Sequence, residues 1–244
     1  MRPEPAYPLL AGPLRRRAGV LLGCCAVIVV VLGLLFAHQT GIDGLDRAVD
    51  SRVIRSLGGH RSLLLWLASP AELGPAGLTS LIMVAICLMT GRLKGAILAA
   101  TAIPVASALC DSVIKPLVHR SIDQDFPSGH VASVLALAAM LTVLLVLPPQ
   151  PLIERRARLL VPVAAGVIAC GVAIAVIGLR WHFFTDTIGG AALGAGTVCA
   201  LVLMLDLRPV SRWLEAPTRW LLARRSASVG AGRRSATGFG EGAV

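Results

Sequence analysis

Long apolar runs separated by short polar segments dominate the sequence of this 244-residue chain. A helix of about 20 apolar residues crosses a hydrocarbon core about 30 Å thick. Six stretches are apolar enough to serve as such spans, and their middles are nearly free of charged residues. The predicted spans are 18–37, 73–90, 93–112, 129–147, 159–179 and 184–207. The pattern therefore predicts an all-α integral membrane protein, a bundle of six transmembrane helices.

The segment between the first two spans has a different pattern. Apolar residues recur there at roughly helical spacing, with acidic and basic residues between them: Ile42, Leu45, Val49, Val53 and Leu57. An amphipathic helix lying in the membrane interface fits this pattern, and a polar loop fits it about equally well.

Composition also indicates a membrane protein, and the distribution of charge predicts how the chain is oriented in the membrane. Hydrophobic residues make up 56% of the chain and charged residues 15%, against roughly 25% in soluble domains. The net charge of +10 could indicate nucleic-acid binding, but the positions of the charges explain it otherwise. With a cytoplasmic N-terminus, 16 of the 23 basic residues lie inside and 7 outside, as the positive-inside rule requires.

This topology predicts three regions in a cell-membrane protein with both termini in the cytoplasm. Residues 1–17 form a basic tail, 18–207 the membrane domain, and 208–244 a second basic tail that we expect to be disordered. The third-to-fourth loop and the turn before the sixth span then face outward together. They hold three of the five histidines, His119, His130 and His182.

The end of the first outer segment, Pro127–His130, has the features of an anion site. Ser128 is a good helix N-cap, and Gly129 lets a ligand approach the backbone. The first amides of the following helix lack intrahelical partners and carry the positive end of the helix dipole. Lys115 and Arg120 add positive charge on the same side. A capped helix with cations reaching to the interface is the simpler alternative.

The second outer segment contains His182 and Asp186, which are four residues apart and would share a face of a helix. A carboxylate bonded to one ring nitrogen makes the other nitrogen more nucleophilic, although the pair could also be a simple interfacial hydrogen bond. With His130, these residues could transfer a phosphoryl group: one histidine attacks phosphorus and the other protonates the departing oxygen. No carboxylate cluster indicates magnesium, and a zinc site would need further ligands, so we expect no metal and no cofactor.

These residues resemble the type 2 phosphatidic acid phosphatase superfamily, which includes bacterial lipid phosphatases. The resemblance is carried by Lys115 to Arg120, by Pro127–His130 and by His182 with Asp186, and it covers roughly 73–207. It implies a metal-independent membrane phosphatase with six helices and an outward-facing site.

The resemblance also implies a role for each matched residue. His182 would be the nucleophile that forms a phosphohistidine, Asp186 would orient it, and His130 would be the general acid. The implied phosphate-binding residues are Lys115, Arg120, Ser128, Gly129 and Arg180.

The chain departs from the family pattern at two arginines. The family's first motif has an arginine seven positions after the lysine, then a proline, where this chain has Ile122 and Asp123. The third motif has an arginine six positions before the histidine, where this chain has Val176. We expect Arg120 and Arg180 to substitute from shifted positions.

The sequence therefore predicts an enzyme that hydrolyses a lipid phosphate or diphosphate, such as a polyprenyl diphosphate, phosphatidylglycerophosphate or phosphatidate. Its expected partners are this substrate and the surrounding membrane lipids, and not nucleic acid. Two alternatives remain: a degenerate family member that binds phospholipid without hydrolysing it, and a membrane transporter. The nearly charge-free span middles disfavour a transporter, which would need polar groups along a path near the midplane.

Arg180→Ala is expected to lower phosphate release strongly, because Arg180 must replace the absent motif arginine. The measurement is phosphate release from lipid phosphates in detergent. A rate close to that of the wild type would show that Arg180 does not bind the phosphate.

Overall fold

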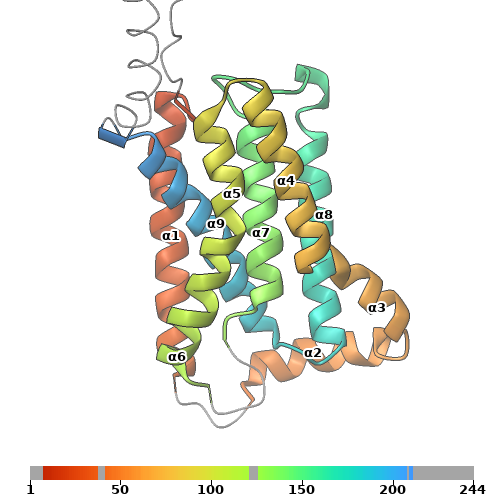
Figure 1. The fold of residues 1–244 in the computed structure, drawn as a ribbon. Helices are drawn as coiled ribbons and strands as arrows, with labels where there is room; N and C mark the ends of the chain where they lie inside the picture. Colours follow the sequence, from red (N-terminus) through yellow and green to blue (C-terminus); the bar gives the residue numbers. More distant parts are fainter. Residues whose placement is uncertain (1–7, 38–41, 121–125, 208, 211–244) are drawn as a thin grey trace, which may run out of the picture.

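The computed structural model describes residues 8–37, 42–120, 126–207 and 209–210 (Figure 1). All regular secondary structure in these residues is helical. The α-helices are α1 (Gly12–Phe36), α2 (Gly44–Leu57), α3 (Arg61–Ala68), α4 (Leu73–Met89), α5 (Leu93–Leu109), α6 (Lys115–Val118), α7 (Gly129–Leu141), α8 (Leu160–Gly178) and α9 (Phe184–Leu205). Short π-helical turns at Cys110–Ile114 and Thr142–Val146 extend α5 and α7, and 3-10 turns occupy Ser69–Ala71 and Arg155–Ala157.

Among the described residues, six helical stretches are long and apolar enough to cross a membrane, which confirms the predicted fold class. They are Gly12–Phe36, Arg61–Met89, Leu93–Val118, Gly129–Val146, Arg155–Gly178 and Phe184–Leu205. The first begins earlier than the sequence predicts, because Pro13 suits the first turn of a helix and starts α1 within the expected basic tail. The expected tails otherwise fall largely outside the described residues, which exclude 1–7 and 211–244.

The centre of the bundle is the contact between α7 and α9, with α9 running obliquely behind α7 in Figure 1. Two glycines of α9 allow the backbones to approach closely. A Cβ atom at Gly190 would collide with the carbonyl oxygen of Ser128, and one at Gly194 with that of Ala132. Small residues have this role at many helix contacts in membranes. The approach fixes the register of α9 against α7.

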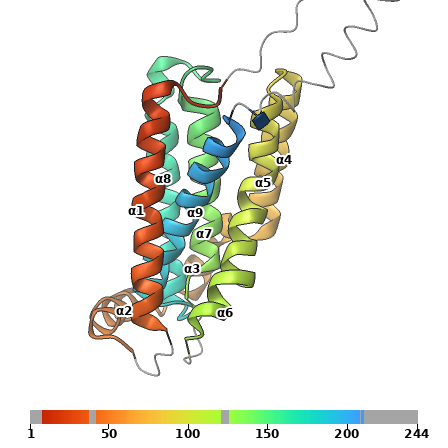
Figure 2. The ribbon, with the colours of Figure 1, turned by 90° about the vertical axis from the view of Figure 1, so that its left-hand side faces the viewer.

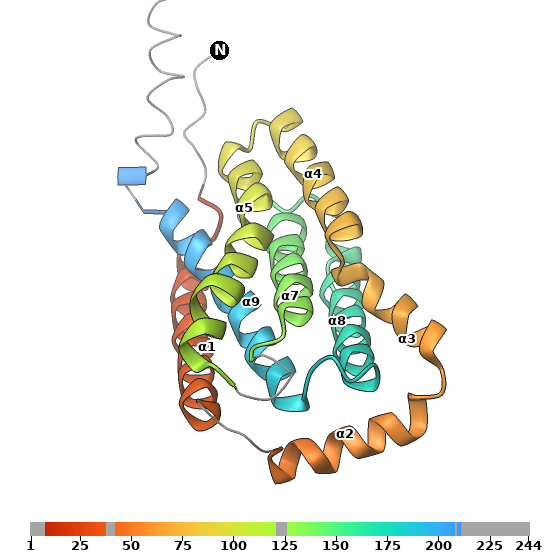
Figure 3. The ribbon, with the colours of Figure 1, turned by 60° about the horizontal axis from the view of Figure 1, so that its bottom comes forward.

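The helix α2 lies across one end of the bundle, as Figure 3 shows. The helical alternative for this segment is therefore correct and the loop alternative is wrong. Two carboxylates of α2 accept hydrogen bonds from the first turn of α9, whose amides have no intrahelical partners. Asp46 accepts from the backbone nitrogen of Thr185 at 2.9 Å, and Asp50 accepts from that of Phe184 at 3.2 Å.

The two ends of the bundle carry different features (Figures 1 and 2). The starts of α7 and α9 and the end of α8 gather beside α2, and with them the candidate site residues. The start of α1 and the end of α9 lie at the opposite end. There, Asp206 accepts hydrogen bonds from the amides of Leu9 and Leu10 and pairs with Lys94 and Arg15. The first and last described helices are thus joined on the side away from the candidate site.

Gly194→Ala is expected to destabilise the protein by about 1–3 kcal/mol, because the new methyl group would collide with the Ala132 carbonyl of α7. Gly166→Ala, on α8, is the matched control, since a Cβ atom there meets nothing within 4 Å. Thermal unfolding in detergent measures both variants. Equal midpoints for the two would contradict the proposed close contact of α7 and α9.

Asp50 gives the stability a specific pH dependence. Desolvation, followed by the nearby Asp46 carboxylate, raises the pKa of Asp50 from 3.8 to about 6, although the Phe184 amide and Arg120 partly oppose the shift. The folded state therefore favours the protonated form, and stability falls as the pH rises from about 4 to about 6. Asp50→Asn should remove this penalty and keep an oxygen acceptor for Phe184.

The Asp50→Asn variant is expected to unfold at a higher temperature than the wild type at about pH 7.5, with a smaller difference at about pH 4.5. Unfolding curves at both pH values measure this. A lower unfolding temperature than that of the wild type at about pH 7.5, with a smaller loss at about pH 4.5, would show that the charged carboxylate stabilises the fold.

Candidate active site

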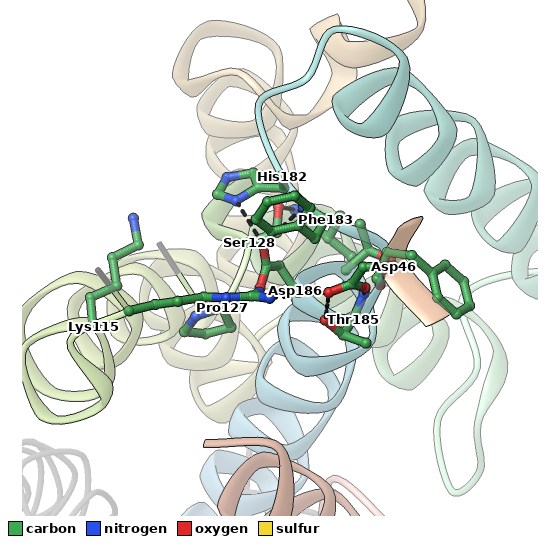
Figure 4. Close-up of polar contacts among 12 residues, drawn as sticks. Asp46, Lys115, Pro127, Ser128, His182, Phe183, Thr185 and Asp186 are labelled. Carbon is green, nitrogen blue, oxygen red and sulfur yellow. Dashed lines mark hydrogen bonds and ion pairs between the residues drawn. The ribbon is translucent and has the colours of Figure 1, made fainter. Parts of the chain in front are cut away.

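The two polar segments that the sequence singles out meet at the α2 end of the bundle (Figure 4). The backbone nitrogen of Ser128 donates a hydrogen bond of 3.0 Å to the carbonyl oxygen of Asp186. The ring of His130 lies against that of Trp181, with 5.3 Å between the centroids. The start of α7 and the segment before α9 are therefore direct neighbours, although they are far apart in the sequence.

The start of α7 has the predicted form of an anion site. Ser128 is the N-cap, is fully buried, and accepts a hydrogen bond from the Val131 nitrogen at 3.5 Å. Gly129 and His130 follow as the first residues of the helix, where geometry leaves the amides without intrahelical acceptors. A Cβ atom at Gly129 would have only ordinary contacts, the nearest at 3.8 Å. The glycine thus leaves room beside amides that favour an anion.

His182 and Asp186 lie close together, but not on one helix face as the spacing suggests. The helix α9 begins only at Phe184, because the Asp186 carboxylate accepts the Phe183 nitrogen at 2.9 Å and so caps the helix. Nδ1 of His182 lies 3.9 Å from Oδ2 of Asp186, which is longer than a hydrogen bond. Catalytic hydrogen bonds are often long without substrate and tighten when it binds.

Arg120 is placed differently from its expected position at the phosphate. Its side chain is fully buried, with Nη1 2.7 Å from Oδ1 of Asp186 and Nη2 3.1 Å from Oδ2 of Asp46. The guanidinium carbon also lies 4.5 Å from the ring centres of both Phe36 and Phe183. Both terminal nitrogens therefore hold carboxylates, and this geometry does not support the expected phosphate contact.

The other two predicted cations have neighbours of their own. Lys115, at the start of α6, has its Nζ 2.8 Å from Oδ1 of Asp111, and both side chains are partly exposed. Arg180 adopts a left-handed backbone conformation with φ of 61°. It lines an open cavity of about 310 Å³ together with Arg61, at the junction of α2, α3 and α8.

Two carboxylates of this region were not identified as site residues from the sequence: Asp46, which holds Arg120 and caps α9, and Asp111, which holds Lys115. The only signal for Asp46 was its place on the polar side of an amphipathic pattern, where solvent exposure is the usual expectation. Within the described ranges, no group of three or more histidine, cysteine, aspartate or glutamate side chains could hold a metal ion.

Comparison with known proteins identifies the family of the chain. Among solved structures, the chain is similar to the crystal structure of a transmembrane PAP2-type phosphatidylglycerolphosphate phosphatase from Bacillus subtilis. The two share 19% identity and a TM-score of 0.59, over 76% of this chain and 95% of that one. This likeness shows a shared fold.

No curated protein matches the chain. The sequence model of the PAP2 superfamily matches residues 75–209, which is more than half of the chain. The resemblance seen in the motifs is thereby confirmed, and the chain is a multi-pass membrane protein that belongs to the PAP2 superfamily.

Proposed function

We propose that the chain is an integral membrane phosphatase that hydrolyses a lipid phosphate or diphosphate through a phosphohistidine at His182, without a metal ion. Its family and its fold support a phosphatase that acts on lipids. One observation carries the proposal for this site: the bond between Ser128 and Asp186 brings the anion-binding start of α7 beside the His182 and Asp186 pair.

The first step is attack on phosphorus by Nε2 of His182. A nitrogen–phosphorus bond forms as the bond between phosphorus and the lipid oxygen breaks. Asp186 stabilises the positive charge that develops on the ring, as a carboxylate beside a reacting histidine does. His130, on the first turn of α7, donates a proton to the departing oxygen.

The second step returns the enzyme to its starting state. His130 is now neutral and can take a proton from water, whose oxygen attacks the phosphohistidine. This attack breaks the nitrogen–phosphorus bond and releases inorganic phosphate. The amides of Gly129 and His130 stabilise the charge on the phosphoryl oxygens in both steps. Lys115 and Arg180 are the remaining predicted cations for this purpose, since Arg120 holds two carboxylates.

The location of the site suits a substrate whose tail stays in the bilayer. The site lies at the ends of helices long enough to span a membrane, beside the amphipathic helix α2. We place this end at the outer face of the cell membrane and both termini in the cytoplasm, as the distribution of basic residues predicts. A phosphate group at the interface could then enter the site while its lipid chain remains among the helices.

The alternative is a family member that binds phospholipid without hydrolysing it. The burial of Arg120 favours this alternative, because it leaves the site with fewer cations than the motifs would supply. Hydrolysis remains the better proposal, because an anion site alone would not need a histidine beside a buried carboxylate.

Purified protein in detergent is expected to release phosphate from at least one lipid phosphate in the presence of EDTA, and vanadate should inhibit the release. His182→Ala should abolish the activity because the nucleophile is lost. His130→Ala should reduce it by about 10²–10⁴-fold because the general acid is lost. Colorimetric phosphate release from several lipid phosphates provides the measurement.

His60→Ala is the matched control, since His60 is exposed at the start of α3. It should retain the wild-type rate. Unchanged activity in His182→Ala would refute the nucleophile, and strict dependence on an added divalent metal would refute the mechanism. Lipid binding without release of phosphate from any of these lipids would support the non-hydrolytic alternative.

A further inference from the structure

We propose that Asp46 of α2 is a positioning residue of the active site, which acts through Arg120 to keep one oxygen of Asp186 available to His182. This inference rests on the proposed function. It assigns to α2, which lies outside the region matched to the family, an indirect role in the chemistry.

The contacts form a continuous chain from α2 to the histidine. Asp46 accepts Nη2 of Arg120 at 3.1 Å, and Asp186 accepts Nη1 at 2.7 Å through Oδ1. The other oxygen of Asp186, Oδ2, accepts the Phe183 nitrogen at 2.9 Å and lies 3.9 Å from Nδ1 of His182. Asp46 thus connects to the nucleophile through two side chains.

Burial makes this arrangement rigid. The side chains of Asp46, Arg120 and Asp186 all have an exposed fraction of 0%. The guanidinium carbon lies 4.5 Å from the ring centres of both Phe36 and Phe183. No water can replace a lost partner in such a place, so each charged group depends on the others.

The geometry of the guanidinium group explains why Asp46 matters to His182. An arginine facing a single carboxylate favours two parallel hydrogen bonds, which would engage both oxygens of Asp186. Here Asp46 takes Nη2, so that only Nη1 contacts Asp186. Asp46 thereby divides the guanidinium between two carboxylates and leaves Oδ2 of Asp186 facing the histidine.

Asp50 provides a matched control on the same helix. It is one turn further along α2, is nearly buried, and caps the same end of α9 through the Phe184 nitrogen. Its carboxylate has no hydrogen bond or ion pair to Arg120 among the described contacts. If α2 served only to cap α9, the two positions would be equivalent, whereas the proposed role makes them different.

The test compares Asp46→Asn and Asp50→Asn in full-length protein in detergent. In Asp46→Asn, kcat for phosphate release should fall by about tenfold or more, with KM within about threefold of the wild type, because ground-state binding is unchanged. Asp50→Asn should keep the wild-type kcat. Unfolding midpoints show that both variants are folded. A wild-type kcat in Asp46→Asn, or an equal loss in both variants, would overturn the inference.

A second readout does not depend on turnover. Diethyl pyrocarbonate acylates the neutral ring of histidine, and mass spectrometry gives the rate at His182. The rate should fall in Asp46→Asn, where a neutral amide oxygen holds Nη2 less strongly than a carboxylate and Arg120 turns toward both oxygens of Asp186, and stay unchanged in Asp50→Asn. If Asp46→Asn does not fold, Arg120→Lys replaces it. Lysine keeps the positive charge but lacks the planar fork that holds both carboxylates in place, so the rate at His182 should fall here too. An unchanged rate at His182 in the folded variant would overturn the inference.

These readouts separate the two proposals. Activity that is lost in His182→Ala but kept in Asp46→Asn would refute only the role of Asp46. A wild-type protein without phosphatase activity would refute the proposed function. In that case the acylation rate of His182 would still decide whether Asp46 acts on the histidine.

Discussion

The close approach of α7 and α9 is the constraint on which the rest of this structure depends. Gly190 and Gly194 let the backbones meet, and at the end of this contact the Ser128 nitrogen donates to the Asp186 carbonyl. The same packing that holds the centre of the bundle therefore brings the first amides of α7 beside His182, the proposed nucleophile. A membrane helix pair obtains such a contact from small residues, because lipid offers no hydrophobic force between helices.

The distribution of charge follows from this contact. Asp186 must be buried beside the start of α7, and a buried carboxylate needs a partner. Arg120 is that partner, and Asp46 shares its charge. The consequence is a site in which one buried cation holds Asp186, so that under the proposed function the substrate phosphate would depend on the helix amides and on the less buried Lys115 and Arg180.

The sequence predicts the spans and the two motif segments well, because long apolar runs and closely spaced polar residues are local patterns. The sequence does not predict the partners of the Arg120 side chain. That side chain reaches Asp46, 74 residues away, and the partner lies on a helix whose polar side is usually assigned to solvent. The start of α9 at Phe184 agrees with the predicted start of the sixth span, but its cap, the Asp186 carboxylate accepting the Phe183 amide, was not predicted. A contact between distant elements decides the position of Arg120, and periodicity carries no information on such contacts.

An experimental structure of the protein with bound vanadate tests the central claim most directly, because vanadate imitates phosphorus during transfer. We expect the vanadium atom to be bonded to Nε2 of His182, with the vanadate oxygens within about 3 Å of the amides of Gly129 and His130. Vanadate bound away from His182, or out of reach of the start of α7, would contradict the account.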